Sequence, residues 1–174
     1  MILINLFGAP GAGKSTGAAY IFSKLKMHGI NAELVTEFAK DKVWEESKAV
    51  FNNQAYIFGK QYFKISRCAD KVDVVVTDSP LLLSLVYNND FTLGEEFNQL
   101  VRKVFGSYNS KNYYLKRTKD YNPVGRFQTE DESDKIGDKI FNLLQRENIS
   151  FTETTGDIEG YDKIVLDILE ELNH

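Results

Sequence analysis

Gly8-Ala9-Pro10-Gly11-Ala12-Gly13-Lys14-Ser15 is the stretch that decides the fold of this 174-residue chain. It fits the pattern G-x-x-x-x-G-K-[ST] at every fixed position, and Thr16 follows it. In this pattern the glycines let successive backbone N–H groups turn inward and form a nest for phosphate oxygens. Lys14 is expected to reach the β- and γ-phosphates of a nucleotide, Ser15 to ligate Mg²⁺, and Thr16 to face the α-phosphate. The stretch therefore predicts a nucleoside triphosphate site.

The segments on either side of this loop supply the context that the motif requires. Residues 2–7 are a continuous apolar run that ends at glycine, which is typical of a strand buried on both faces of a parallel sheet. A helix is expected from Lys14 to about Met27. A bound phosphate would then lie at the positive end of that helix.

The rest of the chain alternates strands with helices. We expect further strands at 31–36 and 72–78, around 113–115, and at 149–152, with helices at about 38–50, 52–70, 131–147 and 159–172. Each parallel connection needs a crossover long enough to hold a helix, so this order predicts a three-layer α/β fold. We expect one domain over 1–174, with a mobile lid at 117–130 because Asn122-Pro123 and Gly125 interrupt a charged segment.

Composition excludes several classes of protein. The net charge of −4 and a sequence pI near 5.3 argue against a general basic surface for long nucleic acid. The single cysteine, Cys68, excludes an intrachain disulfide framework. No run of eighteen apolar residues occurs, and no basic segment precedes the apolar N-terminus, so we expect a cytoplasmic protein without a membrane helix.

Asp78 is the candidate second metal residue. It ends an apolar strand, where parallel α/β sheets place ligand-facing side chains, and it could hold the hydration shell of Mg²⁺. An alternative is that it caps the next helix, because Asp78-Ser79-Pro80 also resembles a helix start. Ser79 stands where motor ATPases usually carry a glutamate, and the chain lacks the N-K-x-D element of GTPases. These two features favour a transferase.

The acceptor of the phosphoryl group is expected beside the second strand. Glu37 follows that strand and is the candidate general base, although it could equally be a helix-start glutamate favoured by the helix dipole. Gln54, Phe58 and Gln61 share one face of the next helix and could hold a flat base, or simply belong to the core. Arg67, further along, is a candidate contact for an acceptor phosphate.

Basic residues gather in the segment expected to form the lid. Lys116, Arg117, Lys119 and Arg126 all follow the fourth strand. A planar guanidinium suits the spreading charge of a phosphoryl group in transfer, so Arg117 and Arg126 are the candidate catalytic cations. The alternative is a charged surface loop without a catalytic role.

With these residues the chain resembles small P-loop kinases of the nucleoside and nucleotide kinase superfamily. The likeness is nearest to the ribosylnicotinamide-kinase-like (NadR-like) proteins that are common in large bacteriophages. Five segments carry it: the loop from Gly8 to Thr16, Thr36-Glu37-Phe38-Ala39, Gln54, Val76-Thr77-Asp78-Ser79-Pro80, and 121–128.

This resemblance implies a P-loop NTPase fold with a parallel five-stranded sheet of order 2-3-1-4-5 and helices on both faces. It implies ATP and Mg²⁺ as cosubstrates and a lid arginine supplied by Arg117 or Arg126. It further implies that Glu37 contacts the acceptor and Asp78 the metal. The acceptor itself is not fixed, because pockets are rebuilt on a constant phosphate site.

Three functions follow from these patterns. The leading hypothesis is a kinase acting on a nucleoside, a nucleotide or a related small acceptor. A second hypothesis is a kinase acting on a polynucleotide end or a DNA base, which would need a basic channel made of Lys111, Lys116, Arg117 and Lys119. A third is a regulatory ATP-binding protein or weak ATPase.

Overall fold

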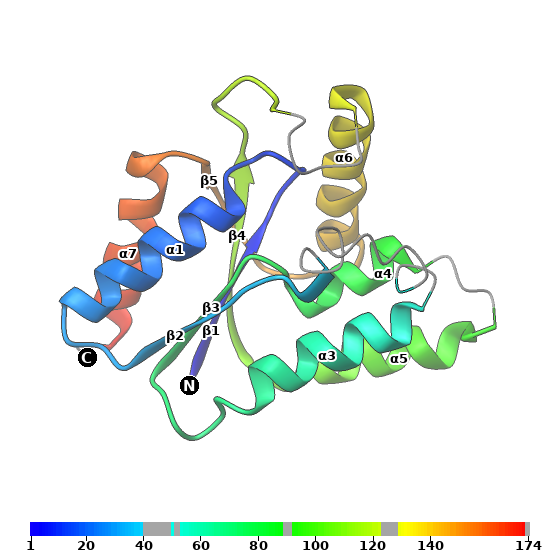
Figure 1. Ribbon diagram of the computed structural model, residues 1–174, viewed down its shortest axis with the longest axis horizontal. Helices are drawn as coiled ribbons and strands as arrows, with labels where there is room; N and C mark the ends of the chain where they lie inside the picture. The colour runs from blue at the N-terminus through cyan, green and yellow to red at the C-terminus, as the bar shows by residue number, and fades with distance from the viewer. Residues whose placement is uncertain (40–49, 51–52, 89–91, 123–128, 173–174) are drawn as a thin grey trace.

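The fold is built on a five-stranded parallel sheet whose middle strand leads into the glycine-rich loop. A computed structural model describes residues 1–39, 50, 53–88, 92–122 and 129–172 (Figure 1). The strands are β1 (Ile2–Phe7), β2 (Ala32–Val35), β3 (Val74–Thr77), β4 (Asn109–Lys116) and β5 (Thr152–Thr155), in the spatial order β2-β3-β1-β4-β5. All four pairings are parallel. The predicted strand order is therefore confirmed.

Helices cover both faces of the sheet, as predicted. On one face lie α1 (Lys14–Met27) and α7 (Ile158–Leu172) (Figure 1). On the other lie α3 (Gln54–Ser66), the short η2 (Leu81–Leu83) and α4 (Ser84–Tyr87), α5 (Gly94–Phe105) and α6 (Glu130–Arg146). The result is a three-layer α/β architecture.

Alternation along β1 explains why one strand can serve two cores. Ile4 and Leu6 pack in the cluster that includes Ile164 of α7. Leu3 and Phe7 point to the other face and pack in the cluster that includes Phe105 of α5. Successive side chains of a strand point to opposite faces, so an uninterrupted apolar run is what a central, doubly covered strand requires.

The start of α6 is fixed by a capping box. Thr129 Oγ1 accepts a hydrogen bond from the backbone N–H of Glu132 (3.3 Å), and the Glu132 carboxylate accepts one from the N–H of Thr129 (2.8 Å). The backbone N–H of Thr129, followed by its hydroxyl, holds the pKa of the Glu132 carboxyl below its ordinary value. Two otherwise unpaired helix N–H groups are satisfied in this way. The cap sets where the first turn of α6 begins.

Some boundaries differ from the sequence prediction. The fifth strand begins at Thr152 rather than at Ile149, because Ile149 still donates its N–H to Leu144 O (2.9 Å) in the turn that ends α6. Asn148 occupies the left-handed region there, with φ 53°. The expected helix at 52–70 is shorter, Gln54–Ser66. Most of the expected helix at 38–50 lies outside the described residues, and α5 was not predicted.

None of the helices that the structure describes combines the length and the apolar character needed to cross a membrane.

Candidate functional site

The glycine-rich loop has the backbone shape that a phosphate nest needs. Gly8, Gly11 and Gly13 have φ values of 140°, 83° and 89°, which L-residues rarely adopt. A Cβ on Gly8 would lie 2.6 Å from the carbonyl oxygen of Leu115, and one on Gly13 would lie 2.8 Å from that of Gly156. Both dihedral and space therefore require glycine at these two positions.

The carbonyl groups of the loop are engaged by side chains of the same protein. Lys14 Nζ donates to Gly8 O (2.8 Å) and Ala9 O (2.9 Å). From outside the loop, the Ser133 hydroxyl donates to Pro10 O (2.7 Å) and the Tyr161 hydroxyl donates to Gly13 O (2.9 Å). No sequence pattern predicted a role at the site for Ser133 or Tyr161.

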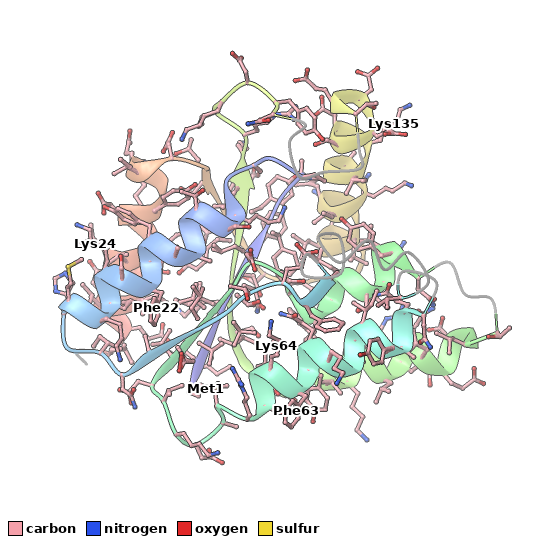
Figure 2. All side chains as sticks on the ribbon, viewed as in Figure 1. Met1, Phe22, Lys24, Phe63, Lys64 and Lys135 are labelled. Carbon is pink, nitrogen blue, oxygen red and sulfur yellow. The ribbon has the colours of Figure 1, made fainter. Side chains whose placement is uncertain are left out.

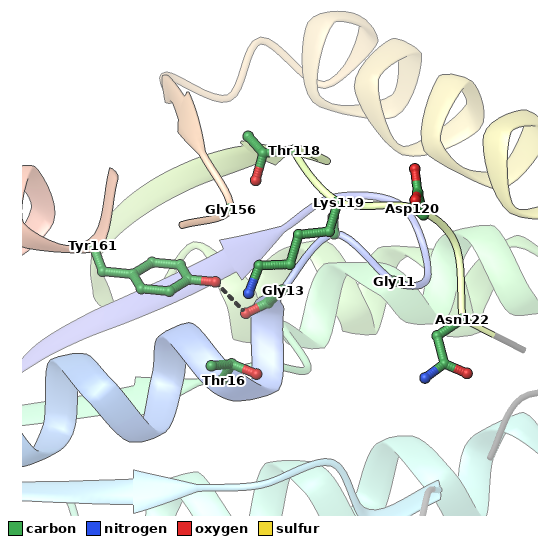
Figure 3. A pocket seen from close by; sticks show the side chains of 10 residues that line it. Gly11, Gly13, Thr16, Thr118, Lys119, Asp120, Asn122, Gly156 and Tyr161 are labelled. Carbon is green, nitrogen blue, oxygen red and sulfur yellow. Dashed lines mark hydrogen bonds between the residues drawn. The ribbon is translucent and has the colours of Figure 1, made fainter. Parts of the chain in front are cut away.

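A pocket of about 260 Å³ opens beside the loop (Figure 3). It is bounded by the loop and the first turn of α1, by the segment after β4, and by the start of α7. Figure 3 shows the side chain of Lys119 extending over this pocket toward Gly13, with Thr16 on its opposite side. The lining residues are Gly11, Ala12, Gly13, Thr16, Thr118, Lys119, Asp120, Asn122, Gly156 and Tyr161.

The two predicted carboxylate residues lie together at the carboxyl edge of the sheet. Strands β2 and β3 are parallel neighbours, with Val35 opposite Thr77, so Glu37 and Asp78 follow adjacent strand ends. Asp78 is 4% exposed, and its Oδ1 accepts a hydrogen bond from the backbone N–H of Glu37 (2.9 Å). Because β3 also pairs with β1, this edge adjoins the end of β1, from which the loop leaves.

Buried polar side chains hold the segment around Glu37 in place. Gln61 of α3 accepts from the backbone N–H of Phe38 (3.0 Å) and donates to Thr77 Oγ1 (3.3 Å). Nearby, Gln54 donates to the Ser84 hydroxyl (3.2 Å), and both side chains are buried. Buried polar groups are nearly always hydrogen-bonded. Here these bonds hold in place the segment that follows β2.

Tyr87 is a further neighbour of Glu37 that sequence reasoning missed. Burial of its phenol raises the pKa of Tyr87 to about 12, and the negative charge of Glu37 contributes in the same direction. Tyr87 still exposes 38% of its surface. Because its pKa lies far above physiological pH, the Tyr87 phenol stays neutral there and can donate a hydrogen bond.

Arg117 lies beside the loop but is occupied by acidic partners. Its guanidinium pairs with Asp134 and, at 3.5 Å, with Glu130, both in the first turns of α6. It also lies 5.4 Å from the centre of the Tyr121 ring and 3.5 Å from the Ser133 hydroxyl that bonds the loop. The structure thus places Arg117 one side chain away from the nest.

Other predicted residues are not brought to the site in the same way. Phe58 is 4% exposed and packs between Tyr62 and Phe97, so the core accounts for it. Its contact with a substrate stays a prediction, as does that of Gln54. Arg126 falls within 123–128, outside the described residues, and the lid that contains it remains a prediction.

Arg67 lies at the wrong end of the molecule for an acceptor phosphate. It follows the last turn of α3, which leads into the start of β3, whereas the loop follows the end of β1. Figure 2 shows Phe63, in the last turns of α3, at the same lower end as Met1, with Lys135 at the opposite end. Because helix and strand run in opposite directions in a parallel crossover, the end of α3 is remote from the carboxyl edge. The contact of Arg67 with an acceptor phosphate stays a prediction, and this position does not favour it.

The basic channel expected for a nucleic acid acceptor is largely neutralised. Lys111 pairs with Glu171 and Lys116 pairs with Glu153 (2.6 Å). Arg117 pairs with the acidic start of α6, as described above. Of the four residues, Lys119 lines the pocket. Basic side chains that are already paired with carboxylates neutralise few phosphates, and so they release few of the counterions condensed on a nucleic acid. The channel is therefore not favoured.

The donor set suits a nucleotide with Mg²⁺. The described residues contain no group of three or more His, Cys, Asp or Glu side chains that could hold a metal by themselves. Mg²⁺ usually takes one or two protein oxygens and completes its shell with phosphates and water. The exposed hydroxyl of Ser15, at the start of α1, and the carboxylate of Asp78 are oxygen ligands of that kind.

Comparison with solved structures identifies the same fold. Deoxyadenosine kinase from M. mycoides with bound dATP aligns with a TM-score of 0.57 at 19% identity, covering 99% of this chain and 100% of that one. The same enzyme with the products dCMP and dCDP bound gives 0.57 and 19%, over 98% of each chain. NadR protein in complex with NR gives a TM-score of 0.73 at 16% identity over 97% of this chain, which spans 50% of the NadR chain.

A search of curated proteins by sequence found no significant match. A family model, that of an AAA domain, matches residues 3–160. This match includes the loop, the carboxylate edge at Glu37 and Asp78, and the start of α7. The chain has the P-loop fold of nucleoside kinases and belongs to this AAA domain family.

Proposed function

We propose that this protein is an ATP- and Mg²⁺-dependent kinase that phosphorylates a hydroxyl or phosphate group of a nucleoside, a nucleotide or a closely related small acceptor. One observation carries the proposal: the backbone N–H of Glu37 bonds Asp78 Oδ1 at 2.9 Å, at the sheet edge that adjoins the phosphate loop. A carboxylate side chain at this edge, that of Glu37, is placed to take the proton of an acceptor group, and phosphoryl transfer to a hydroxyl uses such a base.

The roles of the residues follow from their positions. The nest from Gly8 to Ser15 holds the phosphate chain of ATP, with Lys14 supplying positive charge and Thr16 facing the first phosphate. Glu37 accepts the proton of the acceptor hydroxyl. The acceptor oxygen then bonds the γ-phosphorus while the bond from that phosphorus to the β–γ bridging oxygen breaks, leaving ADP.

Mg²⁺ would be held by Ser15 and by water bound to Asp78, and when bound it would neutralise charge on the phosphates. Asp78 also has a structural role that does not depend on the metal. Its Oδ1 fixes the backbone at Glu37, so the base is oriented by the residue that faces the cation. The alternative role predicted for Asp78 was a cap for the next helix, but the N-cap of η2 is Pro80 and no side chain caps that helix.

The acceptor class is inferred from two sources. The related structures bind dATP, dCMP and dCDP in one case and NR in the other. In this chain, the neutralised basic residues at Lys111 and Lys116 disfavour a polynucleotide. A nucleoside or mononucleotide is therefore favoured over a nucleic acid end.

A mass-spectrometric assay tests this function directly. The protein is incubated with Mg²⁺-ATP and a pooled panel of nucleosides, nucleotides, ribosylnicotinamide and short oligonucleotides. We expect one small acceptor to gain a single phosphoryl group while ATP becomes ADP. Phosphorylation confined to the oligonucleotides would replace the small-acceptor proposal with a polynucleotide kinase. ATP binding without transfer to any member would favour a regulatory ATP-binding protein.

Arg117→Lys is expected to slow transfer about tenfold with little change in the KM for ATP. Lysine keeps the charge but loses the planar fork that suits an equatorial phosphoryl oxygen. Arg117 pairs with Asp134 and Glu130, and we propose that it exchanges these carboxylates for phosphate when ATP binds.

Steady-state kinetics with ATP varied measure this effect, and Arg146→Lys, at the exposed far end of α6, is the matched control. A change in KM alone would place Arg117 in ground-state binding rather than in the transition state.

A further inference from the structure

We propose that Tyr161 and Ser133 are positioning residues of the phosphate site: their hydroxyl groups, from the last two helices, hold the peptide groups of the loop in the orientation that binds phosphate. Neither residue is expected to touch the reacting atoms. The inference rests on the proposed function, because it assigns the two residues to the loop of that same site.

Tyr161 clamps the loop at the start of α1. Its hydroxyl donates to Gly13 O (2.9 Å), which also accepts the first helical hydrogen bond of α1 from Gly17 N (2.8 Å). Its ring lies so close to α1 that a Cβ on Gly17 would come within 2.6 Å of a ring carbon. Tyr161 is 3% exposed, and burial raises the pKa of its phenol, so it remains a donor. Figure 3 shows this bond as a dashed line between two residues that line the pocket.

Ser133 clamps the loop from the opposite layer. Its hydroxyl, fully buried in the second turn of α6, donates to Pro10 O at 2.7 Å. Close packing supports this contact, because a Cβ on Gly137 of the next turn would lie 3.0 Å from the Ala9 side chain. The two clamps thus come from helices on opposite faces of the sheet.

The planarity of the peptide bond converts these contacts into a functional argument. Because C=O and N–H of one trans peptide point in opposite directions, fixing the carbonyl fixes the following N–H. Holding Gly13 O therefore orients the N–H of Lys14, and holding Pro10 O orients the N–H of Gly11. Both N–H groups belong to the stretch that forms the nest. When the two hydroxyls bond these carbonyls, the N–H groups of the same peptides point the opposite way, toward the expected phosphate.

The hydroxyl groups act on a backbone that glycine leaves free to move. Gly11 and Gly13 have positive φ and wide conformational freedom, so the loop does not hold its own shape well. A clamp adds more order at such a position than at an ordinary residue. This accounts for two buried hydroxyls aimed at loop carbonyls, one of which, Gly13 O, receives the Tyr161 hydroxyl in addition to its helical bond from Gly17.

Calorimetric binding of Mg²⁺-ADP and of inorganic tripolyphosphate to the full chain tests the inference. We expect Tyr161→Phe and Ser133→Ala each to weaken both probes about three- to tenfold, the size of one net hydrogen bond. Phenylalanine keeps the ring that packs on Gly17, so this variant removes only the hydroxyl. Tripolyphosphate has no base or sugar, and a loss with this probe therefore reports the loop itself.

Tyr113→Phe is the matched control, because Tyr113 is also buried and its hydroxyl also bonds α7, at Asp167, away from the loop. We expect it to leave both affinities unchanged. Thermal unfolding is recorded for all variants.

If Tyr161→Phe and Ser133→Ala lower the unfolding temperature but bind both probes like the unmodified protein, the two hydroxyls stabilise the fold and the inference is wrong. Should the unmodified protein fail to bind Mg²⁺-ADP, the proposed function itself fails, and this outcome is distinct from the first.

Discussion

Replacing Lys14 with alanine is expected to reduce kcat/KM for phosphoryl transfer about 10²- to 10³-fold, by analogy with the loss of a single charge-stabilising group in other enzymes. The ammonium group now lies 2.8 Å and 2.9 Å from the carbonyl oxygens of Gly8 and Ala9, at the inner rim of the loop. From there it can follow negative charge as it moves toward the leaving oxygen of ADP. Only interactions that strengthen in the transition state raise the rate of the chemical step.

Lys26→Ala is the control for this experiment, because Lys26 is an exposed lysine in the last turn of the same helix. We expect the control to retain full activity. Both variants are assayed at several ATP concentrations, so that kcat and KM are separated. Undiminished turnover in Lys14→Ala would contradict the assignment of the loop as the phosphate site.

The sequence predicts the fold well where local patterns and tertiary packing agree. The apolar run of β1 and the glycine loop place α1 and the sheet order correctly. The fifth strand was misplaced because Ile149 and Phe151 are apolar for another reason, namely packing under the end of α6. The ladder partners of β4 are instead the polar residues Thr152–Thr155, at the edge of the sheet.

The candidate site was predicted only where a motif or a strand end marks it. Lys14, Glu37 and Asp78 follow strand ends that the sequence located, and parallel strands bring such ends to one edge. Ser133 and Tyr161 carry no such mark, because their contacts with Pro10 and Gly13 join residues 123 and 148 positions apart. A serine inside an amphipathic helix and a tyrosine near a helix start are common without function. Only the packing of α6 and α7 reveals them.

Arg67 shows why the face of a helix alone does not locate a site residue. A basic residue on the helix that carries Gln54 and Gln61 resembles a phosphate contact when only the helix face is considered. Position along the helix axis decides instead, since a 13-residue helix spans about 20 Å. Gln54 starts α3 near the site, and Arg67 follows its far end.

Glu37→Gln is expected to reduce phosphoryl transfer about 10²- to 10⁴-fold while Mg²⁺-ADP binds within about twofold of the unmodified protein. Glutamine has the size of glutamate but cannot take the acceptor's proton. The substitution keeps the backbone N–H of residue 37 that bonds Asp78. The separation of binding from chemistry is what distinguishes a kinase from a regulatory nucleotide-binding protein.

Glu33→Gln provides the comparison, since Glu33 is an exposed glutamate of β2, four residues before Glu37 on the same segment. It removes the same charge from the same segment of the chain, and we expect normal transfer. Single-turnover assays with the acceptor found in the panel measure the chemical step apart from product release. Full transfer by Glu37→Gln would exclude proton abstraction by Glu37. Among the residues that the structure describes, Asp78 would then be the carboxylate left at this edge to act as the base, in addition to its proposed place beside the metal.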